Sequence, residues 1–149
     1  AERHLNQGFV DALERLDDCA DDVPGTLKHV AHCFIEMLLS EQSLALYRVL
    51  VAEVKQFSDI GVAFYEVGPD KVNRYLSGYL QRQVDQSLLS ISDVSLAAVS
   101  FLGMVKGDLQ MMALLHPKRL PPKDIIEQRI DWAVTCFLKA SDFNLKLEG

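Results

Sequence analysis

The segment SDVSLAAVSFLGMVKGDLQMMALL, from Ser92 to Leu115, is the most informative part of this chain. Only Lys106 and Asp108 are charged after its acidic start, and its apolar residues recur with helical spacing, which predicts one helix of more than twenty residues. A helix that is apolar nearly all round must be buried on several sides, so we expect both a core and a partner surface. Small residues mark one side, where another backbone could approach: Ala97, Ser100, Gly103 and Gly107.

The rest of the chain also has helical periodicity, without strand-like alternation or an internal repeat. Pro and Gly signals separate the segments, most clearly at Pro24-Gly25 and Gly68-Pro69. We predict an all-α fold of about six helices, forming a single domain over residues 1–149. The expected helices, besides Ser92–Leu115, cover about Glu2–Asp18, Thr26–Leu39, Leu44–Phe57, the short Ile60–Val67, Asp70–Leu89 and Pro122–Phe143.

Composition excludes several classes of function. With 49% hydrophobic and 24% charged residues the chain has ordinary globular proportions, so we expect no disorder. A net charge of −6 argues against binding of nucleic acid or an anionic membrane by these residues. The longest uncharged apolar stretch, Val94–Val105, is well below the roughly 20 residues that a membrane span needs. The start, Ala1–His4, is polar and does not resemble a signal peptide, so we expect a cytoplasmic protein.

Two further features concern compartment and chain start. Cys19, Cys33 and Cys136 are odd in number and widely spaced, which favours reduced cytosolic thiols over a disulfide. The chain has no initiator Met and opens directly inside a helical stripe that includes Leu5 and Phe9. We therefore expect that an N-terminal portion precedes these residues.

Motifs for catalysis and metal binding are weak. His29, His32 and Glu36 have helical spacing that could place them around an ion, but a solvated polar stripe explains them better. Cys33 follows His32 directly, and adjacent helical residues point about 100° apart, so the two cannot form a nucleophile–base pair. No GxSxG, P-loop or GxGxxG motif occurs. We expect neither an enzyme nor a metal or cofactor; a metal-dependent enzyme would need these histidines.

Aromatic and Met residues fall on the expected inner faces of several helices. They fit either a packed core or a cavity between helices, whose adaptable apolar walls suit a small apolar ligand. Asp108 is a carboxylate on a nearly apolar helix, so it needs a partner or a ligand if it is buried. Its position is compatible either with a pocket or with an interface or the surface. The candidate ligand-binding residues are Phe9, Phe34, Met37, Tyr47, Phe64, Tyr65, Tyr79, Phe101, Met104, Val105 and Asp108.

The last two long helices carry more apolar surface than the shorter helices could cover. This favours a seam between two identical subunits, with two helices from each, over packing within one chain alone. The candidate dimer-interface residues are Val99, Leu102, Gly103, Lys106, Ile126, Arg129, Ile130, Trp132, Ala133 and Phe137.

Two stretches carry a resemblance to a known family. LYRVLVAEVKQFSDIGVAFYEVGPDKVNRYLSGYLQRQVDQSLL (Leu46–Leu89) and AAVSFLGMVKGDLQMMALL (Ala97–Leu115), with a final helix near Pro122, resemble the C-terminal regulatory domain of TetR-family transcriptional regulators, in particular the AefR-like subgroup. The resemblance implies an effector-binding and dimerisation domain of a repressor. It also implies that about Asp93–Leu115 and Pro122–Phe143 form the dimeric four-helix bundle, and that the preceding helices line the ligand cavity.

The family's N-terminal helix-turn-helix has no counterpart in these residues. The resemblance therefore implies that DNA is contacted only through that missing domain. We expect a homodimeric sensor of a small apolar or amphipathic effector. Binding of the effector would tilt the first helix and so change the spacing of the two DNA-binding domains across the dimer. The competing hypothesis is a helical protein-interaction module with a solid interior and no ligand cavity.

Overall fold

The computed structural model describes residue 11, residues 13–15 and residues 22–143. Within these residues all regular structure is helical and no strand occurs, which confirms the predicted all-α class. The predicted helix Glu2–Asp18 and the candidate residue Phe9 lie mostly or wholly outside the described residues. The helices are α3 (Val23–Leu38), α4 (Glu41–Glu53), α5 (Ser58–Val67), α6 (Pro69–Asp85), α7 (Val94–Lys106), α8 (Leu109–Leu115) and α9 (Lys123–Ala140).

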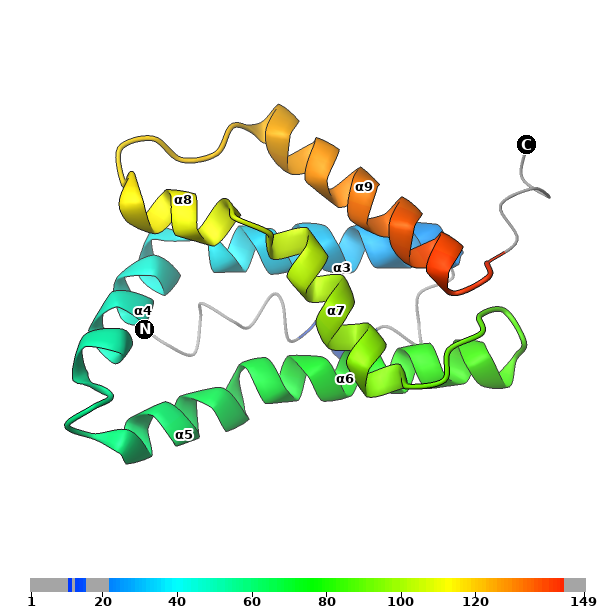
Figure 1. Cartoon of the computed structure of the whole chain (residues 1–149), viewed down its shortest axis with the longest axis horizontal. Coiled ribbons are helices and arrows are strands. Elements are labelled where there is room, and N and C mark those ends of the chain that lie inside the picture. The colour runs from blue at the N-terminus through cyan, green and yellow to red at the C-terminus, as the bar shows by residue number, and fades with distance from the viewer. Residues whose placement is uncertain (1–10, 12, 16–21, 144–149) are drawn as a thin grey trace.

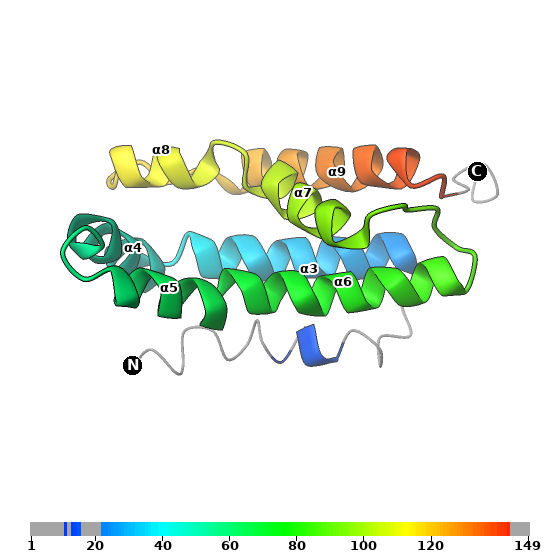
Figure 2. The ribbon, with the colours of Figure 1, turned by 60° about the horizontal axis from the view of Figure 1, so that its bottom comes forward.

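The helices form two layers that α7 connects diagonally (Figures 1 and 2). One layer contains α8 and α9, and the other contains α3 and the nearly collinear pair α5 and α6, which Figure 1 shows apart from α3. At one end of the molecule, α4 joins α3 to α5. Because α7 packs on α6, α9 and α3, it is the central element of the core.

Local sequence signals explain where these helices begin. Asp22, Ser40 and Asp93 each occupy the N-cap position, and their side chains accept a backbone N–H bond from Gly25, Ser43 and Leu96, respectively. Between α5 and α6, Gly68 ends one helix and Pro69 starts the next, where its missing N–H costs nothing. The observed helices lie within a few residues of those predicted.

The predicted long helix Ser92–Leu115 is wrong as a single element. It is divided into α7 and α8 by Gly107 and Asp108, and the two helices are bent by 45°. Gly107 has φ 45° and ψ −127°, a backbone conformation that only glycine adopts easily, and it ends α7. The break adds one helix, so residues 22–143 contain seven.

No single helix among the described residues is long and apolar enough to cross a membrane. The pair α7 and α8 would pass by combined length and composition, but it is bent and contributes to the core, and buried helices of globular proteins pass the same test.

The core is built from α3, α6, α7 and α9. Phe101 of α7 is fully buried, and its ring lies 5.2 Å from that of Phe137 in a tilted arrangement. Ion pairs also join α3 to α9 at the surface, where Lys28 contacts Asp131 at 3.6 Å. These helices carry most of the buried apolar surface of the described chain.

Helices α4 and α5 contribute nothing to this core cluster. Leu44 is the one buried residue of α4, and α5 has none. The prediction that their aromatic and branched residues point inward is therefore wrong for the single chain. The exposed large apolar side chains of this region are Tyr47, Val49, Val51, Val54, Phe57, Ile60, Val62, Phe64, Tyr65 and Val67.

Candidate functional site

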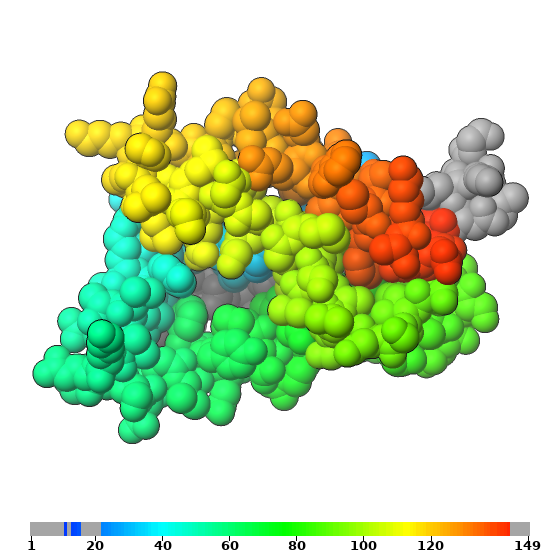
Figure 3. All heavy atoms as spheres, viewed as in Figure 1, coloured from blue at the N-terminus to red at the C-terminus, as the bar shows by residue number. Residues whose placement is uncertain are grey.

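A hollow opens on one face of the molecule, bordered by α4, α5, α7 and α8 (Figure 3). The ribbon shows why it exists: α4 carries the chain away from α3 and α8, and α5 returns at a distance from both (Figure 1). The α8 side is tied to α4 by a hydrogen bond that Arg48 Nη2 donates to the backbone oxygen of Leu114 at 3.1 Å. The two walls are thus connected at one end of the hollow.

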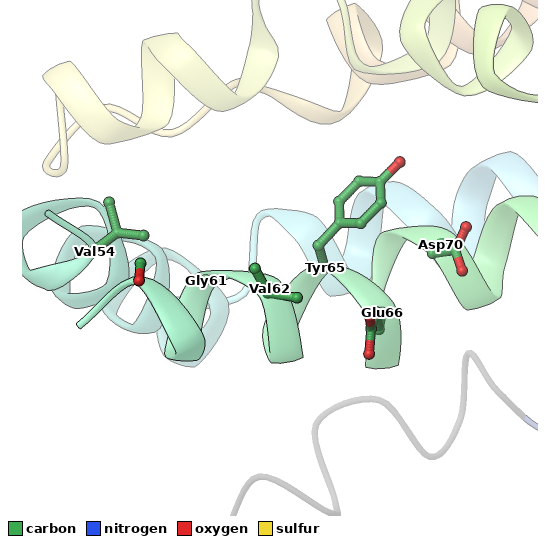
Figure 4. A pocket seen from close by; sticks show the side chains of 7 residues that line it. Val54, Gly61, Val62, Tyr65, Glu66 and Asp70 are labelled. Atoms are coloured by element: carbon green, nitrogen blue, oxygen red, sulfur yellow. The ribbon is translucent and has the colours of Figure 1, made fainter.

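An open cavity of about 590 Å³ lies along α5. Val54 and Tyr65 project from this region toward the layer that contains α8 (Figure 4). A Cβ at Gly61 would lie 2.5 Å from Cγ2 of Val54, so glycine allows the end of α4 to fold closely against α5. The lining residues are Val54, Ser58, Gly61, Val62, Tyr65, Glu66 and Asp70.

Of the predicted ligand-binding residues, Tyr65 is the one that lines this cavity. The others in its wall were missed, although Ser58, Gly61 or Val62, Tyr65 or Glu66, and Asp70 recur at three- and four-residue spacing. The helical spacing of these residues is visible in the sequence, on a face that mixes small, apolar and acidic side chains rather than aromatic ones alone.

The remaining predicted ligand-binding residues are divided among three environments. Tyr79, Phe101 and Val105 are buried in the core, and Phe34 and Met37 are partly buried and packed against it. Tyr47, Phe64 and Met104 are exposed by 37–38%. The structure therefore does not bring the predicted set together around one cavity.

Asp108, the proposed polar handle, is exposed and pairs with α9. Nη1 of Arg129 donates to its Oδ1 at 2.6 Å. This hydrogen bond lowers the pKa of the Asp108 carboxyl, and the charge of Arg129 acts in the same direction. Its partner is thus a cation of the same chain, and Asp108 does not line the cavity on α5.

A second open cavity, of about 460 Å³, lies between α7 and α9 and is lined by Met104, Gln128, Arg129 and Trp132. Trp132, the only tryptophan of the chain, is 69% exposed beside it. Among the predicted dimer residues, Val99 and Gly103 are also exposed on α7, and Lys106, Ile126 and Arg129 are partly exposed.

Four predicted dimer residues belong to the core of the single chain. Leu102, Ile130, Ala133 and Phe137 are buried by 92% or more, so the chain itself covers nearly all of their surface. They point from α7 and α9 into the shared core, because these two helices pack on each other as well as presenting an outer face.

The histidines of α3 make ordinary surface contacts. Nε2 of His32 lies 3.2 Å from a carboxylate oxygen of Glu127, and His29 lies 3.8 Å from the Cys33 sulfur. Burial raises the pKa of the Cys33 thiol, and Glu36 adds to that rise, which is the opposite of what a nucleophilic cysteine needs. Within the described residues, no group of three or more potential ligands could hold a metal ion.

The chain is similar in sequence and in fold to transcriptional regulators. A family model described as the AefR-like transcriptional repressor, C-terminal domain, matches residues 25–140. A crystal structure assigned to the TetR family of transcriptional regulators, from Mesorhizobium loti MAFF303099, has a TM-score of 0.82 and 24% sequence identity, over 92% of this chain and 67% of that one. The flavonoid-responsive regulator FrrA has a TM-score of 0.73 and 25% identity, over 90% of this chain and 71% of that one. No curated protein sequence matches significantly.

Proposed function

Because this chain belongs to the family of AefR-like transcriptional repressor C-terminal domains, we propose that it senses a small apolar effector and forms the homodimer of a repressor. That the chain is part of a transcriptional regulator follows from the family and from its structural neighbours. Its effector, its oligomeric state and the sign of its regulation are the proposal.

The exposure of apolar side chains on α4 and α5 is the observation that carries the effector proposal. These helices border the hollow and contribute nothing to the core cluster, yet they expose many large apolar residues. Proteins rarely leave so much apolar surface exposed to water, and where they do, it usually marks a site that binds a ligand or a partner. An apolar effector in the hollow would cover it.

The cavity on α5 also suggests the chemistry of the effector. Tyr65 and Val62 offer apolar contact, whereas Glu66 and Asp70 offer carboxylate oxygens that accept hydrogen bonds. These carboxylates would repel an anion, so we propose a neutral, planar, apolar compound with hydroxyl donors. Flavonoids have this chemistry, and one structural neighbour is a flavonoid-responsive regulator.

The outer face of α7 and α9 is the proposed dimer surface. Leu96, Val99 and Gly103 follow one another at helical spacing on the exposed side of α7, and Trp132 is exposed on α9. Nothing in the described chain lies within 4 Å of a Cβ built on Gly103, so a partner helix could approach closely. The same patch on two copies would form an isologous contact.

In the proposed mechanism, the effector changes the equilibrium between two arrangements of the helices around the hollow. It can do so only by its difference in affinity for the two, typically about 1–3 kcal/mol. A net charge of −6 disfavours DNA contact by this chain, so we propose that a helix-turn-helix domain outside these residues binds the operator. We propose that the effector lowers operator affinity.

A titration with quercetin, a flavonoid, tests the effector site. We expect quercetin to raise Tm and to bind the parent chain, and Val62→Asp to weaken binding by tenfold or more. Leu120→Asp is the control, because Leu120 is 52% exposed but lies between α8 and α9, away from α4, α5 and the lining of the cavity. Equal affinity in both variants, or no binding to the parent, contradicts the proposed site.

Sedimentation equilibrium tests the dimer. We expect a homodimer for the parent and a monomer for Val99→Arg, which places a charge on the outer face of α7. Val51→Arg is the control, because Val51 is similarly exposed but lies on α4. A monomeric parent, as the interaction-module hypothesis allows, would rule out the homodimer.

A further inference from the structure

Asp108 stands at the N-terminal boundary of α8, yet its side chain makes no hydrogen bond to the backbone of that helix. Aspartate at this position ordinarily caps its own helix. Here the carboxylate instead accepts the 2.6 Å bond from Arg129, which lies 21 positions away on α9. The carboxylate thus does not cap α8 and instead connects α8 to α9.

The guanidinium of Arg129 also packs directly over the bend. A Cβ at Gly107 would lie 3.2 Å from Nη1 of Arg129, so the absence of a side chain leaves room for this approach. The pair is exposed, with 57% of the Asp108 side chain accessible, and exposed ion pairs contribute little to stability. Its geometry therefore matters more than its stabilising energy.

The pair lies between the two surfaces assigned above. Arg129 lines the cavity beside Trp132 on the proposed dimer face, whereas Asp108 begins α8, which borders the hollow. A movement of α8 toward an effector would displace Asp108 from Arg129. The carboxylate could then bond to its own helix, and Arg129 would be free to move within the α7–α9 cavity.

We propose that Asp108 and Arg129 form a latch that couples the effector hollow to the α7–α9 face. The latch rests on the proposed function for its biological role, but its geometry can be tested separately. It assigns positioning roles to both residues: neither needs to touch the effector.

The first test uses the chain without effector. Acrylamide quenching of Trp132 reports on the groove that Arg129 lines, since no other tryptophan is present. We expect Asp108→Asn and Arg129→Gln to change the quenching constant, and the exchange Asp108→Arg with Arg129→Asp to restore it. Asp131→Asn, which removes the other α9 ion pair to Lys28, is the control and should match the parent.

Quenching that is the same in Asp108→Asn as in Asp131→Asn overturns the latch. So does an exchange variant that folds, as judged by circular dichroism, but behaves like Asp108→Asn. Restoration by charge exchange is the decisive readout, because a loss of local packing alone would not be reversed by it.

The second test measures coupling. We expect saturating quercetin to change the dimer dissociation constant of the parent by about fivefold or more, and that of Asp108→Asn by less than about twofold. Undiminished coupling in Asp108→Asn overturns the latch while leaving the proposed function intact. Failure of the parent to bind quercetin or to dimerise instead contradicts the proposed function, and the latch is then decided by the quenching result.

Discussion

Gly107 sets the direction of α8 through one backbone conformation. Its φ of 45° stops α7 after Lys106, and the chain then turns by 45°. In the sequence the same glycine appears as one of several small residues on a helix face, and nothing local distinguishes it from Gly103. What distinguishes Gly107 is its left-handed backbone conformation and the guanidinium of Arg129, which lies 3.2 Å from where a Cβ would be.

A substitution at Gly107 should therefore be costly. We expect Gly107→Ala to lower the free energy of unfolding by about 1–3 kcal/mol, because an L side chain is strained at this φ and would press on Arg129. Gly78→Ala, inside α6 with only the end of Arg82 at 3.4 Å, should instead stabilise by about 0.5–1 kcal/mol. Urea denaturation measures both; two variants of equal stability would contradict the strain at Gly107.

The Asp108–Arg129 pair should give a pH-dependent signature. Because Arg129 lowers the pKa of Asp108 in the folded chain, the contribution of the carboxylate is present above its ordinary pKa and is lost as pH falls through the lowered value. We expect the Tm difference between the parent and Asp108→Asn to be constant from about pH 8 to 5 and to shrink below about pH 4. Arg129→Gln should show the same profile; a difference that persists unchanged at pH 3 would argue against the pairing.

At the scale of elements, α4 and α5 differ from the other helices in burial rather than in helical periodicity. Their apolar residues recur as those of α6 do, so the sequence predicts inward faces for both. The core is formed by α3, α6, α7 and α9, each with several buried residues, and α4 and α5 lie outside it. Periodicity gives the apolar side of a helix, but not whether another helix covers that side.

This difference predicts uneven local stability. We expect backbone amides of α4 and α5 to exchange hydrogen faster than those of α7 and α9, because few buried contacts oppose local opening. Quercetin should slow exchange in α5 if it occupies the hollow. Hydrogen exchange followed by mass spectrometry provides the measurement, and uniform protection across these four helices would contradict the expectation.

On the scale of the whole molecule, the chain combines one packed core, formed by α3, α6, α7 and α9, with one open region around α4 and α5. A domain of this size has a net stability of only about 5–15 kcal/mol, so most of it must come from the helices that are packed. Helix α7 borders the hollow (Figure 3), and its Met104 also lines the open cavity between α7 and α9.

Two phenylalanines distinguish the core from the open region. Phe101→Ala should cost about 3–5 kcal/mol of unfolding free energy, because its buried ring packs against Phe137. Phe57→Ala, at a position 52% exposed after α4, should cost less than about 1 kcal/mol. Thermal unfolding at fixed protein concentration compares them; a comparable loss in both would mean that α4 and α5 are covered in solution.

Most helix positions, the turns between them and the resemblance to the family could be predicted from local patterns, because caps, Gly-Pro signals and helical periodicity act over a few residues. Three features depend on the three-dimensional packing: which apolar faces are covered, where the long Ser92–Leu115 segment breaks and which group pairs with Asp108. Burial and ion pairing join residues that are distant in sequence, such as Asp108 and Arg129, so no local pattern specifies them.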